Sequence, residues 1–356
     1  MSTSTFYNLV VVTNWPCQLL VMITMAIAWV AQPALLYAET MDVVIVAGSD
    51  LSVKSVRKTG TITEFTGKTL TIESQSGRQL KIPAKQIVRI ETPWNEEKLA
   101  GDRAYQQQKL REAAALYAQA ANKEPRVWAR RKIMVQSIWC FQNLGQPTRA
   151  ASLFVALLQS DPHTGDFNAI PLVWLPRHPD ATTEQLAVNW LGSQQGPVVH
   201  LMAASWLLSS PHQQKAREVL SRLLNHEDSR VAQLASAQLW RHQVHTVRTA
   251  DLARWHRILE NMPFKFRAGP YFLLGTALAR HAREEEAVIA YLRVSIQFAQ
   301  HRALAAKSLL RAAQISETLD RQDQAIRLYQ ELVDDYANWT AGDEARQHLA
   351  RLKPGL

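Results

Sequence analysis

Few residues of this sequence have the types and spacing that catalysis or metal binding requires. His242 and His245 are three residues apart, so on a helix they would share one face and could bind a metal ion, but no third ligand accompanies them. Glu284–Glu286 and Asp334–Asp335 fit the exposed surface of helices better than a paired acid and base. No phosphate-binding glycine loop, HExxH, CxxC or Gly-x-Ser-x-Gly motif occurs. We therefore predict a protein that is not an enzyme and that holds no cofactor and no metal.

The first 38 residues contain no Asp, Glu, Lys, Arg or His, and Leu19–Ala31 is apolar except for Thr24. This run of 13 residues is shorter than the about 20 that a membrane-spanning helix needs, and it suits the apolar core of a secretory signal. Pro33 follows the run, and the small Ala38 offers a cleavage edge. Residues 1–38 are therefore expected to be a cleaved signal peptide, which places the protein in a periplasm-like or extracellular space.

An uncleaved membrane anchor is the alternative for this segment. Met1–Trp15 has no Lys or Arg, and Leu36 stands where a signal cleavage site prefers a second small residue. If Phe6–Val12 joined the apolar core across Asn14 and Pro16, a tilted helix would be long enough to span a bilayer. The protein would then stay associated with the membrane through its N-terminus.

The composition is that of a folded protein with basic character. Apolar residues make up 47% of the chain and charged residues 20%, which argues against disorder. The net charge of +9 would suit an acidic partner such as nucleic acid, anionic lipid or an anionic wall polymer, and the densest cationic run is Arg126–Lys132. Cys140 lies within the apolar stretch Ile138–Phe141 and is expected to be a small buried hydrophobic residue.

Residues 41–92 show the period-two alternation of half-buried strands. Leu70 and Ile72 alternate with polar residues, and so do Leu80 and Ile82. Turn signals containing glycine separate these runs. The predicted strands are Val43–Val46, Gly60–Phe65, Thr69–Ser74, Arg78–Ile82 and Gln86–Ile90.

The segment TGTITEFTGKTLTIESQSGRQLKIPAKQIVRIET, which ends at Thr92, resembles the SH3-like and Sm-like small barrels. Barrels of these families bind peptides, RNA or cell-wall material, or serve as adaptors. The resemblance implies a small SH3-like β-barrel over residues 41–92. Basic residues outnumber acidic ones in this segment, which we interpret as a charged solvent face.

After Pro93 and Trp94 the hydrophobic period becomes that of helices. Residues 100–125, 138–162, 274–299 and 312–337 share one order: a small residue, a large residue, a polar turn, alanine, an aromatic residue and a helix end. The small residues would let two antiparallel helices approach closely, and the aromatic residues would fill the space between units. The small residues are Gly101, Gly275, Ala113, Ala150, Ala287 and Ala325, and the aromatic ones are Tyr117, Phe154, Tyr291 and Tyr329. This order is similar to that of the tetratricopeptide repeat (TPR) family, whose unit is a helix-turn-helix of about 34 residues.

The two resemblances together imply a mainly α protein, an α-solenoid of TPR-like helical hairpins with a small N-terminal β-barrel domain. TPR-like repeats are expected at 94–162 and 268–356, and the second set closes with a capping helix over Ala341–Leu352. Residues 163–267 begin with a proline-rich connection and are expected to form degenerate helical repeats of the same solenoid. Their tryptophans are expected to be core wedges: Trp190, Trp206, Trp240 and Trp255.

A solenoid of this kind presents a long concave surface for binding. The expected function is therefore a non-enzymatic scaffold or adaptor of the cell envelope that mediates protein–protein interactions. The family's groove residues come from the first helix of each unit. Matched to this sequence, they are Lys98, Asp102, Tyr105, Gln106, Lys132, Gln142, Asn143, Thr276, Arg280, Gln314 and Glu317.

A polyanion-binding protein is the alternative function. It would use the basic β-barrel and Arg126–Lys132 to bind nucleic acid or an anionic wall polymer. Binding of this kind weakens steeply as salt is added. Protein segments are nevertheless the expected partners, in preference to nucleic acid.

Overall fold

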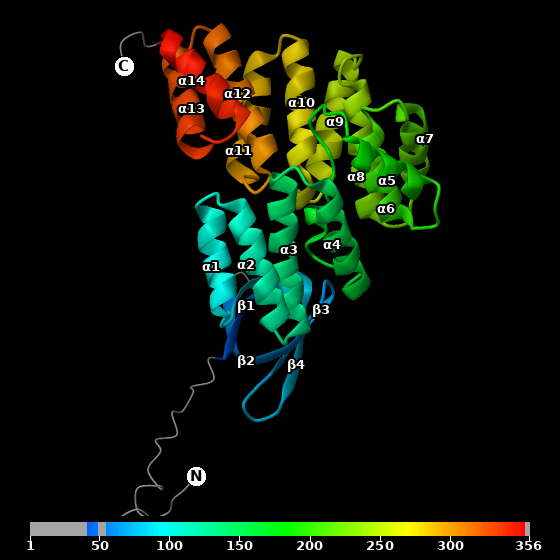
Figure 1. The fold of residues 1–356 in the computed structure, drawn as a ribbon, viewed down its shortest axis with the longest axis vertical. Helices are drawn as coiled ribbons and strands as arrows, with labels where there is room; N and C mark the ends of the chain where they lie inside the picture. The colour runs from blue at the N-terminus through cyan, green and yellow to red at the C-terminus, as the bar shows by residue number, and fades with distance from the viewer. Residues whose placement is uncertain (1–40, 49–54, 353–356) are drawn as a thin grey trace, which may run out of the picture. The chain divides into compact units, whose positions relative to one another are not determined.

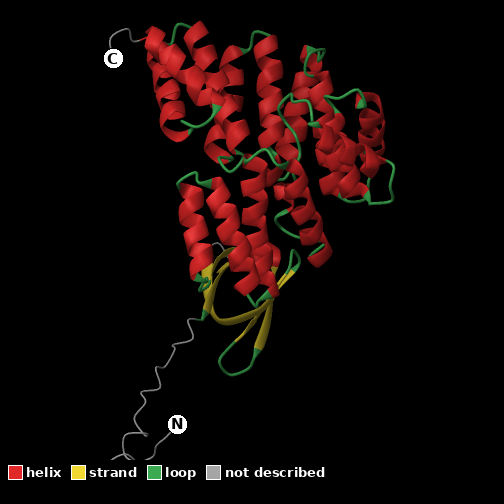
Figure 2. Cartoon of the chain, in the orientation of Figure 1, coloured by secondary structure: helices red, strands yellow, loops and turns green. Residues whose placement is uncertain are grey.

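The computed structural model describes residues 41–48 and 55–352, and the described residues from Asp42 onward belong to one compact unit. A small β-sheet comes first in the chain and helices follow to the end (Figures 1 and 2). The predicted signal peptide or anchor, residues 1–38, lies outside the described residues. Within the described ranges no helix is both long enough and apolar enough to cross a membrane.

The sheet has five antiparallel strands in the order β4-β3-β2-β1-β5. Leu70 and Ile72 on β3 are buried together with Ile62 on β2 and Ile82 on β4, as the period-two alternation predicts. The turn between β3 and β4 contains Gly77 with a φ of +76°. The strands are β1 (Asp42–Ala47), β2 (Ser55–Phe65), β3 (Thr69–Glu73), β4 (Gln79–Pro83) and β5 (Ile87–Glu91).

The described ladders form an open series rather than a closed ring. β4 and β5 stand at the two edges, and a single 3₁₀ turn, Ala84–Gln86, connects them in the chain. The structure thus confirms a small antiparallel sheet at this place, while closure into an SH3-like barrel stays a prediction.

Fourteen α-helices follow the sheet within the described residues. Consecutive helices pack against each other from α1 to α4 and again from α10 to α14. The chain is thus mainly α, with a solenoid-like series of helices. The helices are α1 (Glu96–Gln106), α2 (Leu110–Lys123), α3 (Val127–Asn143), α4 (Pro147–Ser160), α5 (Ala181–Leu191), α6 (Pro197–Leu207), α7 (Gln213–Leu223), α8 (Ser229–Gln243), α9 (Thr249–Asn261), α10 (Ala268–Arg280), α11 (Glu284–Gln297), α12 (Arg302–Thr318), α13 (Gln322–Asp335) and α14 (Thr340–Leu352).

Four helical hairpins share one turn geometry. Gln108, Gly145, Ala282 and Asp320 connect α1–α2, α3–α4, α10–α11 and α12–α13, and all four have a φ between 53° and 69°. In each turn the following residue donates its N–H to a carbonyl of the first helix, at 2.9 or 3.0 Å. Only one of the four residues is glycine, the residue that adopts this left-handed conformation most easily, and the same hydrogen bond closes all four turns.

In two of these hairpins the aromatic ring expected to fill the space between units lies inside the hairpin, against the small residue of the first helix. A methyl group placed on Gly101 would lie 2.8 Å from the ring of Tyr117, and one on Gly275 would lie 3.1 Å from the ring of Tyr291. Both rings are buried. Each glycine therefore lets the tyrosine of the second helix lie directly on the backbone of the first helix.

The middle of the chain contains a connection without α-helix, residues 161–180, followed by helices α5–α9. Trp240 and Trp255 stack with ring centroids 4.5 Å apart, and Trp190 lies 5.3 Å from Trp206. Three of these four tryptophans are buried and Trp190 is partly buried against the same core, so they act as core wedges.

Helix α3 joins the sheet to the repeats. Trp128 is buried in the sheet core, and its Nε1 donates a 3.0 Å hydrogen bond to the carbonyl of Ile62. Arg131 donates to the carbonyl of Phe65 at 2.7 Å. The amide of Gly67 in turn donates to the carboxylate of Asp161 at 2.8 Å. These bonds fix β2 and the turn after it on α3 and on the residue that follows α4.

Candidate functional site

The predicted groove residues lie on the first helices of four hairpins, α1, α3, α10 and α12, and many of their polar groups bond within the protein. On α1, Lys98 Nζ lies 2.6 Å from Asp102 Oδ2. Asp102 also accepts a 2.9 Å hydrogen bond from the hydroxyl of Tyr117. Gln106, in the last turn of α1, is exposed.

The bond between Tyr117 and Asp102 has counterparts in two other hairpins. The hydroxyl of Tyr291 donates to Thr276 Oγ1 at 3.0 Å, and that of Tyr329 donates to Glu317 Oε2 at 2.8 Å. In each case the tyrosine lies on the second helix and its acceptor on the first. Burial raises the pKa of all three tyrosines, which keeps each hydroxyl protonated as a donor. Thr276 and Glu317 therefore support the hairpins from within.

Glu317 also connects the last two hairpin helices to the capping helix α14. His348 Nδ1 lies 2.9 Å from Glu317 Oε2, and Arg351 pairs with the other oxygen. Burial acts to raise the pKa of Glu317, but the hydrogen bonds from Tyr329, His348 and Arg351 outweigh it and lower the pKa. Glu317 is thus a charged acceptor within a structural network.

Asn143, at the end of α3, bonds to residues near the start of α12. Its Nδ2 donates to the carbonyl of Gln300 at 3.1 Å and to the hydroxyl of Tyr105 at 3.2 Å, and its Oδ1 accepts from the amide of Arg302 at 3.1 Å. The ring of Trp139 lies edge to face against that of His301, with the ring centroids 4.7 Å apart. Burial raises the pKa of Tyr105 to about 12. Tyr105 and Asn143 therefore hold distant parts of the chain together.

The remaining predicted groove residues differ in whether their side chains are bonded to other parts of the protein. Gln142 donates to the carbonyl of Ala169 at 2.7 Å, and Lys132 pairs with Asp166 at 2.6 Å. Gln314 accepts a hydrogen bond from a neighbouring arginine of α12. Arg280, like Gln106, is exposed and makes no side-chain bond within the described residues. The structure therefore does not bring the predicted residues together as one free surface.

The basic run Arg126–Lys132 is largely used inside the protein. Arg126 Nε lies 2.7 Å from Glu124, and its guanidinium also bonds to Thr92 and lies 3.5 Å from Asp42. Arg131 is buried and Lys132 is paired. This arrangement does not support the expectation that the run forms an exposed site for a polyanion.

The sheet–helix cleft, as we name it, is an open cavity of about 1550 Å³, counting the space open to solvent. One wall is the turn after β2, the 3₁₀ turn and strand β5. The other wall is α1, α3, the residues after α4 and Lys265. Its lining residues are Phe65, Thr66, Gly67, Ala84, Lys85, Ile87, Val88, Arg89, Ile90, Trp94, Lys98, Trp128, Arg131, Lys132, Val135, Gln136, Asp161, Thr164, Gly165, Asp166 and Lys265.

Two lysines of the helical wall each lie over an aromatic ring at the border of this cleft. Lys98 Nζ lies 4.6 Å from the centre of the Trp94 ring, and Lys132 Nζ lies 4.9 Å from that of Phe65. Trp94 in turn lies 6.1 Å from the buried Trp128. The cleft therefore combines positive charge with apolar surface, which suits a ligand that carries both acidic and apolar groups.

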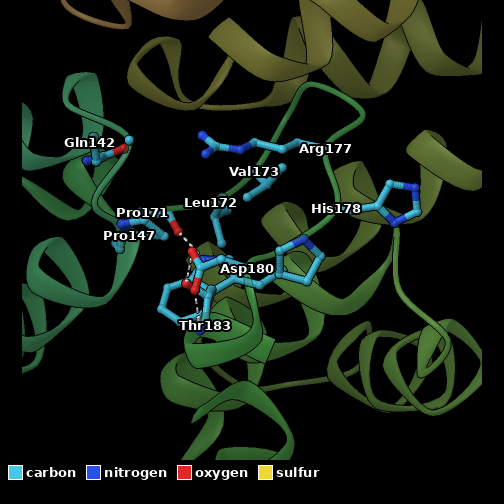
Figure 3. A pocket seen from close by; sticks show the side chains of 12 residues that line it. Gln142, Pro147, Pro171, Leu172, Val173, Arg177, His178, Asp180 and Thr183 are labelled. Carbon is cyan, nitrogen blue, oxygen red and sulfur yellow. Dashed lines mark hydrogen bonds between the residues drawn. The ribbon is translucent and has the colours of Figure 1, made fainter. Parts of the chain in front are cut away.

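A second cavity, of about 610 Å³, lies between the turn after α3, the connection and α5 (Figure 3). Its carboxylate, Asp180, caps α5 by accepting from the amide and the hydroxyl of Thr183, at 2.8 and 2.9 Å. These bonds lower the pKa of Asp180. Trp206 Nε1 donates to the carbonyl of Pro171 at 2.8 Å. Asp180 and Trp206 thus serve the fold, whereas Arg177 and His178, which also line this cavity, are exposed and make no side-chain bond within the described residues.

The residues first considered for chemistry lie apart. Helix α8 ends at Gln243, so His245 does not share a helical face with His242, which contacts Arg217 instead. The part of the chain that the structure describes contains no group of three or more potential metal ligands. Cys140 is fully buried, and burial raises its pKa to about 12, which keeps the thiol protonated.

Comparison with known proteins supports the repeat assignment for one hairpin. Residues 307–338 match the family model of the tetratricopeptide repeat. This TPR match covers most of α12 and all of α13. TPRs mediate protein–protein interactions and are generally non-catalytic. No curated protein matches the chain.

The sheet–helix cleft is the feature that the sequence did not predict. In the sequence, Trp94 marks the change of hydrophobic period, and Lys132 and Lys265 belong to short cationic runs, but nothing there marks Asp161 or Asp166. Lys265 reaches the cleft by donating to the carbonyl of Gly165, 100 residues earlier in the chain. Only the folded path of the connection brings these residues together.

Proposed function

We propose that the chain is a non-enzymatic, exported scaffold or adaptor that binds segments of protein partners in the cell envelope. The observation that carries this proposal is the TPR match on α12–α13, together with the same turn geometry in three other hairpins. The polar side chains inside these hairpins are engaged in internal hydrogen bonds. The sheet–helix cleft and the exposed first-helix residues are what is left for binding.

Export is part of the proposal because of the N-terminal composition. The uncharged first 38 residues and the apolar run Leu19–Ala31 support a signal peptide. Cell fractionation with N-terminal sequencing of the native protein tests this. We expect a new N-terminus just after Ala38 in the envelope fraction. A cytoplasmic protein that retains residues 1–38 would overturn the proposal of export.

Protein binding is tested by site-specific photo-crosslinking in the cells that naturally produce the chain. A photoreactive amino acid replaces Gln106 or Arg280, which are exposed on first helices, and replaces Glu112 on the second helix α2 as the matched control. We expect the same partner proteins to be captured from Gln106 and Arg280, and few from Glu112. Equal capture from all three positions, or none, would contradict a scaffold that uses its first helices.

The cations of the cleft are the one observation that favours the polyanion alternative. A single-stranded oligonucleotide and an anionic wall polymer are the probes. Binding that falls steeply as salt rises would support this function, and absent or salt-independent binding would remove it.

A further inference from the structure

Strand β5 lies at an edge of the sheet and borders the sheet–helix cleft. Among the described residues, the strand order leaves β5 paired with β1 alone. Successive side chains of a strand point to opposite faces, yet four consecutive residues of β5, Ile87–Ile90, line the cleft. A cavity that touches both faces of a strand runs along its edge. The cleft therefore lies beside the unpaired backbone groups of β5.

A β-bulge interrupts the ladder between β1 and β5. Ile45 pairs with Arg89 and Val46 pairs with Ile87, so Val88 has no partner on β1. Val88 is 64% exposed and lines the cleft. Bulges commonly re-aim a side chain at a functional site. Here the bulge presents an apolar side chain beside free backbone groups.

The cleft carries an excess of positive charge. Six cationic side chains line it, against two carboxylates. Two further carboxylates, Glu91 and Asp102, pair with lining cations from outside the cleft, so two cations are still in excess. The six cations are Lys85, Arg89, Lys98, Arg131, Lys132 and Lys265.

Three of these cations have no carboxylate partner within the described residues. Arg131 is buried and donates to the carbonyls of Phe65 and Ser160. Lys265 donates to a carbonyl, and Lys85 makes no side-chain bond in the described part of the chain. A cation held only by neutral carbonyls attracts an added anion more strongly than a cation already paired.

We propose that an extended acidic segment of a partner protein adds to β5 as a further strand. This inference rests on the proposed protein-binding function and names the partner's chemistry. Backbone hydrogen bonds to β5 hold the segment, as in other cases of strand addition. Acidic side chains face Lys85 and Lys265, which have no carboxylate partner within the described residues, and the alternate, apolar side chains contact Val88 and Trp94. A second copy of this chain does not fit, because its own β5 and the turn before it would bring Arg89 and Lys85 against the same cations.

The test uses the full chain and a fluorescent eight-residue peptide of alternating glutamate and valine. Lys85→Glu with Arg89→Glu is expected to weaken binding at least about tenfold. Arg57→Glu with Lys81→Glu makes the same change in net charge on exposed residues outside the cleft, and is expected to alter binding by less than about twofold. The proposal is overturned if the two double substitutions weaken peptide binding equally, or if a lysine–valine peptide binds as tightly as the glutamate–valine peptide.

Strand addition has its own signature. Hydrogen exchange at the amides of Ile87–Ile90 is expected to slow when the peptide binds, and a peptide methylated on alternate backbone nitrogens is expected to lose most of its affinity. A methylated peptide that binds equally well would show attraction by charge alone and would refute strand addition. An oligonucleotide that displaces the peptide and binds more tightly would assign the cleft to a polyanion instead.

The two proposals can fail separately. If Gln106 and Arg280 capture partner proteins but the glutamate–valine peptide does not bind, the scaffold function stands and the inference about β5 is wrong. If neither experiment detects binding, the proposed function itself is refuted.

Discussion

Gly269→Ala tests how the connection packs on helix α10. A methyl group at residue 269 would lie 1.9 Å from Cδ2 and 2.2 Å from Cε2 and Cε3 of Trp174. Carbon atoms that are not bonded pack best at about 3.5–4.0 Å, so the indole would have to leave its position. Trp174 is buried and its ring is rigid, so it moves as one body. The substitution therefore displaces the residue that fixes the connection on α10.

Two opposing effects, overpacking and helix propensity, set the expected change in the free energy of unfolding. Overpacking of a buried site costs about 1–3 kcal/mol, and an alanine in a helix gains at most about 1 kcal/mol over glycine. Because the contact at Gly269 is so short, we expect the free energy of unfolding to fall by about 2 kcal/mol. Gly275→Ala is the matched control on the same helix. Its methyl group would lie 3.1 Å from the ring of Tyr291, so the two terms should nearly cancel.

Urea unfolding of the full chain, followed by circular dichroism and tryptophan fluorescence, measures both variants. A double-mutant cycle with Trp174→Ala then isolates the contact. With the indole removed, Gly269→Ala should have little effect on stability. If Gly269→Ala is as stable as the unsubstituted chain, or if the two substitutions are additive, the proposed packing of Trp174 on the backbone of α10 is wrong.

Three further predictions concern stability. Burial lowers the pKa of His301 from 6.5 to about 4, so between these pH values the unfolded chain takes up a proton that the folded chain does not. The contribution of His301 to the free energy of unfolding should be full above pH 6.5 and fall by up to about 3 kcal/mol toward pH 4. If the urea midpoint of His301→Phe falls with pH as steeply as that of the unsubstituted chain, His301 is not the group responsible. Arg126→Ala leaves the buried carboxylates of Asp42 and Glu124 without their cation and should lower the free energy of unfolding by about 3 kcal/mol, measured by calorimetry. Arg130 is exposed, so Arg130→Ala should have little effect. Ala282→Gly relieves a left-handed alanine and should stabilise the protein by about 1 kcal/mol in urea unfolding; a destabilised variant would show that the turn is not strained.

The hydrophobic periods of the sequence predicted the elements because they depend on nearby residues alone. The alternation of Leu70 and Ile72 with polar residues identified β3, and the change of hydrophobic period after Trp94 marked the start of the helices. Gly101 was expected to let two helices approach closely, which the structure shows, but Tyr117 was expected between units and instead lies against Gly101 within one hairpin. A helical hairpin is a local unit, so its small and bulky positions are fixed by sequence distance.

The groove residues were less predictable because a family pattern gives a position and not its neighbours. Asn143 lies on a first helix, as the resemblance implies, but the start of α12 occupies its amide group. Glu317 likewise faces the capping helix. Whether a first-helix residue is free depends on what the rest of the chain places against it.

The sequence by itself determined the order and type of the elements, the small residues that let the two helices of a hairpin approach closely, and the charge and hydrophobicity of the N-terminal segment. The tertiary structure alone decided the sheet–helix cleft, the contact of Trp174 with Gly269, and the bonds from Asn143 to Gln300 and Arg302. The physical reason is the irregular connection at residues 161–180. Its backbone follows no repeating pattern, so side-chain packing and single hydrogen bonds, formed only in the folded chain, determine its path.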